Sequence, residues 1–109
     1  MPKVSQKQIK GEEHLVGRFW DDINVVSSAE RMTYFEHLLT PTEVMMLAKR
    51  AAIFKDLINK RSYVEISGEY GVGVNTISRL SNTLHQADPD FIVILTKLGA
   101  KEERKGIFG

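Results

Sequence analysis

The sequence contains no cysteine, few prolines and no long run of apolar residues. Without cysteine, disulfide bonds and thiolate metal sites are excluded. The apolar runs span only a few residues, so we predict no signal peptide, no membrane span and a cytoplasmic location. The three histidines, His14, His37 and His85, are scattered. No glycine-rich loop follows a strand, so we expect neither an enzyme nor a cofactor site.

The sequence also lacks an excess of either charge, because 15 basic and 14 acidic side chains leave a net charge of +1. The distribution is more informative than the sum. Residues 1–10 hold three lysines and no acid, and we predict a basic arm there. Residues 49–61 hold five basic side chains against Asp56 alone. A phosphate backbone attracts such a block, although a solvated helix face has the same composition.

The chain is short, with 109 residues, 42% of them hydrophobic and 27% charged. These values are typical of one globular domain. We predict a helical domain over residues 11–99 and a charged tail over residues 100–109. A domain of this size buries a modest fraction of its surface, and a partner subunit often completes it.

Apolar residues at helical spacing predict about six helices and an all-α fold, since no alternating run is long enough for a sheet. We expect the first helix over residues 11–26, and the fifth over residues 74–85. The last should start at Asp88 and Pro89 and stop at Gly99. The predicted starts share a capping-box pattern, at residues 27–30, 40–43 and 62–65.

The first two predicted helices are unusually apolar for helices at the edge of a small domain. Their large apolar side chains are Phe19, Trp20, Met32, Tyr34 and Phe35. They could form a core within one chain. We favour the alternative that they pack on a second subunit, because most soluble oligomers are twofold dimers.

Residues 62–84 carry the functional signal, and we predict a helix-turn-helix there. Such a motif needs a small residue where its helices cross and a positive φ at the turn, which Ser67 and Gly71 supply. Its inner surface would consist of Ile66, Tyr70, Val72, Ile77, Leu80 and Leu84. The outward side chains would be Asn75, Thr76, Ser78, Arg79, Asn82 and Thr83, a compact polar face suited to the major groove. A plain helical hairpin with a glycine turn is the alternative.

The chain resembles the Trp repressor family over about residues 12–98. The resemblance rests on three strings in order: Leu39-Thr40-Pro41-x-Glu43, Leu47-x-x-Arg50, and Gly71-x-Gly73-x-x-Thr76-Ile77-x-Arg79-x-Ser81-Asn82-x-Leu84. It implies two interlocked chains that form a homodimer on double-stranded DNA, with a role in transcription regulation, as a repressor.

The resemblance also assigns roles to individual residues. The matches to base-facing positions are Gly73, Val74, Asn75 and Ser78, and Thr76 matches a phosphate contact. Thr40, Arg50 and Arg79 match an effector pocket in which two arginines sandwich an indole. From the residues themselves we add Arg79 and Asn82 to the DNA-binding set, with Lys60 and Arg61 near phosphates.

Three departures from the Trp repressor pattern alter these expectations. The stretch from Arg50 to Gly71 is one residue shorter, Val64 stands in place of a base-contacting arginine, and Leu80 stands in place of a pocket glycine. We therefore expect that tryptophan is not an effector, and the identity of any other effector is left open.

A sequence-specific transcriptional regulator is the leading hypothesis. A DNA-binding subunit of a transposase comes second, because such heads usually continue into a catalytic or coiled-coil segment, which this sequence does not contain. A helical interaction module without DNA binding is the third, and a salt titration of binding separates it from the others.

Overall fold

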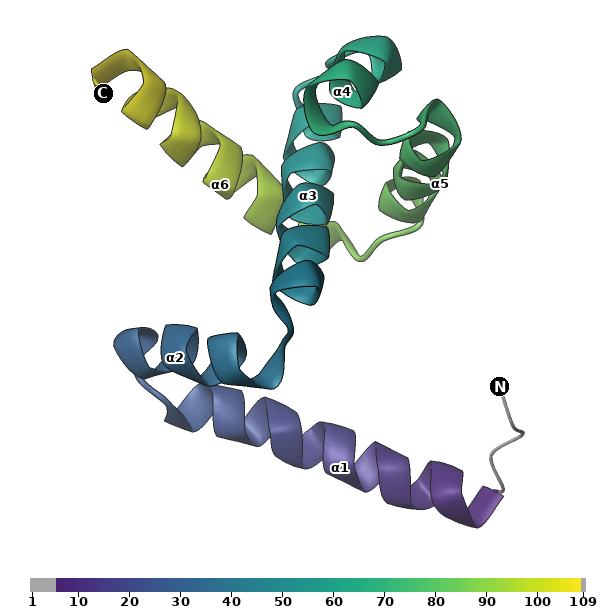
Figure 1. Ribbon diagram of the computed structural model, residues 1–109, viewed down its shortest axis with the longest axis vertical. Coiled ribbons are helices and arrows are strands. Elements are labelled where there is room, and N and C mark those ends of the chain that lie inside the picture. The colour runs from purple at the N-terminus through teal and green to yellow at the C-terminus, as the bar shows by residue number, and fades with distance from the viewer. Residues whose placement is uncertain (1–5, 109) are drawn as a thin grey trace. The chain divides into compact units, whose positions relative to one another are not determined.

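The computed structural model describes the backbone of residues 6–108 and the side chains of residues 12–99. Within this part the chain forms helices and no strand (Figure 1), which confirms the predicted all-α fold. The helices are α1 (Gln6–Val25), α2 (Ser28–Leu38), α3 (Pro41–Ile58), α4 (Tyr63–Tyr70), α5 (Val74–His85) and α6 (Pro89–Phe108). They belong to two compact units, Met1–Pro41 and Thr42–Gly109, which we describe separately.

The two terminal helices are longer than predicted. α1 begins at Gln6, not at Gly11, so part of the predicted basic arm is helical, and residues 1–5 lie outside the described residues. The prediction that α6 stops at Gly99 is wrong, because the helix continues to Phe108. Good helix formers follow Gly99, and one glycine costs a helix only about 1 kcal/mol. Gly99 is buried and close to the Asn59 side chain, so it allows close packing at this point and does not end the helix.

In the first unit, α2 begins with the capping box predicted at residues 27–30. The Ser27 N–H donates to Glu30 Oε1 at 2.8 Å, and the Glu30 N–H donates to Ser27 Oγ at 3.2 Å. Hydrogen bonds from the backbone and the hydroxyl of Ser27 lower the pKa of Glu30. The cap therefore fixes where α2 begins.

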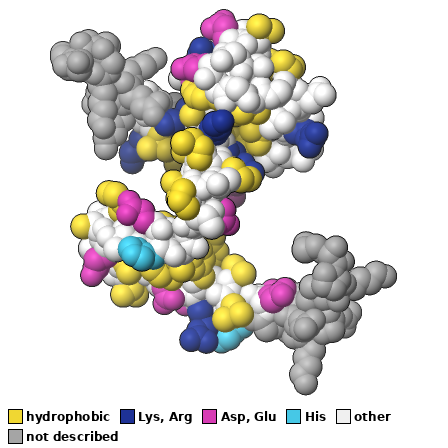
Figure 2. All heavy atoms as spheres, viewed as in Figure 1, with side chains coloured by type: hydrophobic (Ala, Val, Ile, Leu, Met, Phe, Trp, Pro, Cys, Tyr) yellow, Lys and Arg dark blue, Asp and Glu magenta, His cyan; other side chains and the backbone are white. Residues whose placement is uncertain are grey.

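Aromatic rings join the two helices of this unit. The Phe19 ring lies 5.7 Å from Trp20, 6.3 Å from Tyr34 and, edge-on, 6.2 Å from Phe35, measured between centroids. Nevertheless, none of residues 12–41 is buried, and Trp20 is 58% exposed. Apolar side chains gather over α1 and α2 on the face seen in Figure 2. The described part of this unit therefore has no closed core of its own.

The second unit is built around α3, whose Ile53 and Phe54 are both buried. Ile53 packs with Ile66 of α4 and Ile77 of α5, and all three are essentially inaccessible. Phe54 packs with Leu84 of α5 and Leu95 of α6 in a second cluster. These clusters attach α4, α5 and α6 to one central helix (Figure 1).

Candidate nucleic-acid interface

α4 and α5 form the predicted helix-turn-helix, and Gly71 makes the turn. Gly71 adopts φ 63° and ψ 36°, the left-handed conformation that glycine accepts without steric cost. Its N–H donates to the Ser67 carbonyl at 3.0 Å and closes α4. Gly73 then caps α5 with φ −62° and ψ 147°. The turn chemistry that the sequence predicted is confirmed at Gly71.

The inner face of the motif is apolar, as predicted. Ile66 and Ile77 are both 0% exposed, and partly buried Tyr70, Val72 and Leu80 pack around them. Leu84 is buried in the neighbouring cluster. These contacts fix the angle between α4 and α5, and so the direction in which the outer face of α5 points.

The outer face of α5 carries every side chain that the sequence assigned to it, since Asn75, Thr76, Ser78, Arg79, Asn82 and Thr83 are all exposed. The N-cap Gly73 and Val74, which the resemblance matched to base-facing positions, are exposed as well. The Thr83 hydroxyl donates to the Arg79 carbonyl of its own helix at 3.1 Å, so it is partly engaged. The result is one helix with a buried apolar side and an exposed polar side.

Lys60 lies at the corner between α3 and α4 in an unusual conformation. Its φ is 62°, and among the described residues it is the non-glycine residue with a positive φ. The Lys60 N–H donates to the Leu57 carbonyl at 3.0 Å, and the Arg61 N–H donates to the Asp56 carbonyl at 3.1 Å. This is a Schellman motif, in which glycine is the usual occupant of the left-handed position. The Lys60 side chain is exposed.

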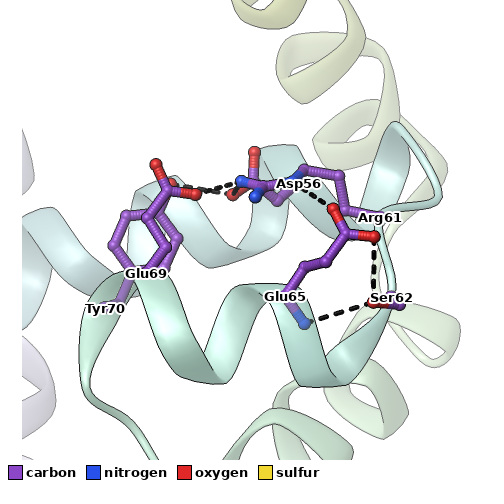
Figure 3. Close-up of polar contacts among 6 residues, drawn as sticks. All are labelled: Asp56, Arg61, Ser62, Glu65, Glu69 and Tyr70. Atoms are coloured by element: carbon purple, nitrogen blue, oxygen red, sulfur yellow. Dashed lines mark hydrogen bonds and ion pairs between the residues drawn. The ribbon is translucent and has the colours of Figure 1, made fainter.

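Arg61, the other basic residue predicted at this corner, contacts three carboxylates (Figure 3). Its Nη1 donates to Asp56 Oδ2 at 2.8 Å and also to the Glu69 carboxylate, and its Nε lies 3.6 Å from Glu65 Oε2. The Tyr70 hydroxyl donates to the same Asp56 oxygen at 2.8 Å. We name Asp56, Arg61, Glu65, Glu69 and Tyr70 the corner cluster.

Sequence reasoning missed the corner cluster, although one signal for it was available. Glu65 and Glu69 follow Arg61 by four and eight residues, the spacing of one helical face. Asp56 had no such signal, because it precedes the turn and reaches Arg61 only after the chain has reversed. Hydrogen bonding to Glu69 and attraction by Asp56 raise the pKa of Arg61 above its usual value. Burial and the Asp56 bond raise the pKa of Tyr70 to about 12.

The opposite end of α4 is tied to α5. The Tyr63 hydroxyl lies 2.7 Å from Oγ of Ser81, which is the buried polar residue of the described core. Ser62 caps α4 by accepting from the Glu65 N–H at 3.1 Å. The Ser62 hydroxyl also donates to Glu65 Oε1. The capping box predicted at residues 62–65 is therefore confirmed for the serine, whereas the glutamate accepts from the Ser62 hydroxyl.

Of the predicted effector residues in the second unit, two lie together and one does not share their surroundings. Arg50 and Leu80 line a hollow of about 170 Å³ between α3 and α5, together with Met46, Lys49, Ile53, Val72 and Thr76. Both also line a wider hollow of about 680 Å³ with Phe54 and Phe91. Arg79 is absent from the described lining of either hollow and points to the exposed side of α5. Thr40 lies in the first unit, which is described by itself.

Comparison with known proteins adds the family. The model of the family described as Trp repressor protein matches residues 17–99, which is more than half of the chain. The chain belongs to the Trp repressor family. This family consists of helix-turn-helix regulators that bind DNA, so the protein is a DNA-binding regulator in general terms. No solved structure matches the chain.

Among the residues that the structure describes, no helix is both long and apolar enough to cross a membrane. No group of three or more metal-ligating side chains lies close together in the same part of the chain.

Proposed function

We propose that this member of the Trp repressor family is a sequence-specific transcriptional repressor that binds its operator as a homodimer. The observation that carries the proposal is the exposed polar face of α5 opposite a largely buried apolar face, on a helix that follows a left-handed glycine turn. A recognition helix needs both properties, because it must be held rigidly while its other side enters the major groove.

The chemistry of that face suggests how bases are read. Asn75 can pair bidentately with adenine, and Arg79 can pair with guanine. Val74 is 45% exposed, and its methyl groups suit the methyl of thymine. A side-chain carbon added at Gly73 would meet nothing within 4 Å, so neither packing nor φ requires glycine there. We infer that Gly73 lets the backbone approach DNA closely, with Ser78, Thr76 and Asn82 completing the contact surface.

Lys60 is the proposed phosphate contact at the α3–α4 corner. A lysine in the left-handed region costs about 1–2 kcal/mol relative to an ordinary conformation. Strain of this kind persists where a side chain has a use, and the exposed ammonium group of Lys60 suits a DNA backbone.

The dimer proposal rests on the first unit. Leu15, Val16, Trp20 and Met32 are each more than half exposed, and no residue of 12–41 is buried. A stable unit needs a closed apolar core, so a second copy is the natural cover for these helices. Two reading helices would then lie about 34–36 Å apart.

The test combines two measurements on the whole chain. Selection from random duplexes should enrich a twofold-symmetric sequence, and its affinity should fall steeply with salt, because phosphate contacts release counterions. Sedimentation at micromolar concentration should give twice the chain mass. A folded monomer, or the absence of any enriched duplex, would contradict the proposal.

A further inference from the structure

α4 is too short to hold its own conformation. It has eight residues, and isolated helices shorter than about 12 residues are marginal in water. Its one buried residue is Ile66, near the middle. Both ends of α4 therefore need other attachments if the helix-turn-helix is to keep one geometry.

The structure supplies one attachment at each end. At the start of α4, the Tyr63 hydroxyl bonds Ser81 of α5 at 2.7 Å. At the end of α4, the Tyr70 hydroxyl bonds Asp56 of α3 at 2.8 Å, and Arg61 bridges the same Asp56 to Glu69 (Figure 3). The two tyrosines are seven residues apart, or about two helical turns, so they emerge on one side of α4.

Resting on the proposed DNA-binding function, we propose that Tyr63, Tyr70 and Arg61 are positioning residues that hold α4 between α3 and α5, and that Arg61 contributes to DNA recognition through Asp56 and Glu69 instead of through a phosphate. The sequence alone had suggested a phosphate contact for Arg61.

Electrostatics favours the positioning role of Arg61. One guanidinium faces the carboxylates of Asp56, Glu65 and Glu69, so the corner cluster as a whole is acidic. An acidic cluster repels a phosphate, and a phosphate that took Arg61 would leave Asp56, only 17% exposed, without its cation. Lys60, one residue away, has an exposed side chain, and a phosphate that it bound would not take the cation away from Asp56.

The tyrosines provide the cleanest test, because Tyr70→Phe and Tyr63→Phe remove one hydroxyl each and change no charge. A hydrogen bond of this kind changes an equilibrium about 3- to 10-fold. We expect each variant to bind its selected duplex about 3- to 10-fold more weakly, with the salt dependence of wild type. Unchanged affinity in both variants would overturn the proposal.

Arg61 is tested against its neighbour. Arg61→Gln should weaken binding and leave the slope of log affinity against log salt unchanged, and Arg61→Lys should restore part of the loss. Lys60→Ala is the matched control, in which the slope should flatten by about one unit because a phosphate contact is lost. The same flattening in Arg61→Gln would show that Arg61 contacts a phosphate and would refute its positioning role.

A readout without DNA separates this inference from the proposed function. Amide hydrogen exchange in the free protein should accelerate about 10-fold or more over residues 66–71 in Tyr70→Phe, while α3 amides around Ile53 keep their protection. If wild type binds no duplex, the proposed function fails, but the exchange result still tests the attachment. If exchange in α4 is unchanged, the attachment is absent whatever the DNA result.

Discussion

Gly71 and Gly73 lie two residues apart in the same turn and differ in why they are glycine. Gly71 has φ 63°, which a side chain tolerates poorly, whereas Gly73 has φ −62°, which any residue adopts. Around both, a side-chain carbon would meet nothing within 4 Å. The conformation of the backbone therefore explains Gly71. Gly73 has only its place as the N-cap of α5, where glycine is one of several favoured residues.

Alanine substitutions should separate these two roles. Gly71→Ala should lower the free energy of unfolding by about 1–2 kcal/mol, the cost of a left-handed alanine. Gly73→Ala should change it by less than about 1 kcal/mol, because a less flexible unfolded chain offsets a poorer N-cap. If Gly73 faces DNA, its added methyl should weaken binding about tenfold, near the low end of an overpacking cost. Urea unfolding and a duplex titration measure both effects, and a Gly73→Ala protein with wild-type affinity would remove Gly73 from the interface.

Lys60 should show a conflict between stability and function. Lys60→Gly relieves the left-handed strain but makes the unfolded chain more flexible, so we expect a gain in unfolding free energy of at most about 1 kcal/mol. Lys60→Ala retains the strain and should give no such gain. Both variants lose the ammonium group and should bind all duplexes more weakly to the same extent. A Lys60→Gly protein that is both more stable and equally tight would argue against the phosphate contact.

Asn75 should determine sequence preference without supporting the fold. It is exposed on α5, so Asn75→Ala should leave the unfolding free energy within about 0.5 kcal/mol of wild type. A bidentate contact with adenine is worth about 1–3 kcal/mol of discrimination, and the variant should lose that preference at one position of each half-site. Parallel selections from random duplexes measure this directly. Identical selected sequences for the variant and wild type would mean that Asn75 does not read a base.

Tyr70 should make the fold sensitive to alkali. Its pKa in the folded protein is about 12, above the ordinary value of 10.0, so the unfolded chain loses the proton first. The stability that depends on this proton is complete below about pH 10 and is lost as the pH rises from about 10 to about 12. Tyr70→Phe lacks the proton and should lose less stability across this window than wild type does. Urea unfolding at pH 9 to 12 checks the difference, and parallel curves for the two proteins would contradict it.

How far the sequence predicts this structure depends on how local the determinants are. The bounds of α5, the turn at Gly71 and the Ser27–Glu30 cap follow from residues next to one another in the chain, and all three were predicted. The Asp56 partner of Arg61 was not, because Asp56 precedes the turn and meets Arg61 only after the chain has reversed. The helical spacing of Glu69 was a local signal that was not used. Likewise, nothing local marks Lys60 as left-handed, since the Schellman bonds that require it form when α3 ends.

The smaller hollow between α3 and α5, which Arg50 and Leu80 line, should not accept tryptophan, because the Leu80 side chain already occupies space beside it. Leu80 is partly buried, packs against both apolar clusters of the second unit and lines the hollow next to Arg50. Glycine at this position would leave a void that an indole could fill, whereas leucine fills it with its own side chain. Overpacking a filled site costs about 1–3 kcal/mol. That cost offsets much of the roughly 4–8 kcal/mol in a millimolar to micromolar affinity.

The positions of the arginines support the same prediction. A sandwich around an indole needs two guanidinium groups that face one another, but Arg79 does not line the described hollows that contain Arg50. Phe54 is buried against Phe91, with their ring centroids 5.4 Å apart, and the two rings line the wider hollow without adding a second cation to it. We therefore expect DNA binding that is indifferent to tryptophan.

Titration calorimetry of the protein with L-tryptophan tests this prediction, and saturable micromolar binding would refute it. Leu80→Gly is the companion variant. It removes a partly buried side chain and places glycine inside a helix, so the unfolding free energy should fall by about 3 kcal/mol. If the variant stays folded and its titration shows a heat of binding that wild type lacks, Leu80 is the residue that excludes the indole. If neither protein binds tryptophan, opening a void at Leu80 is not enough. The placement of Arg79 outside the hollows that Arg50 lines then accounts for the exclusion, because the two arginines do not together form a charged site for an amino acid.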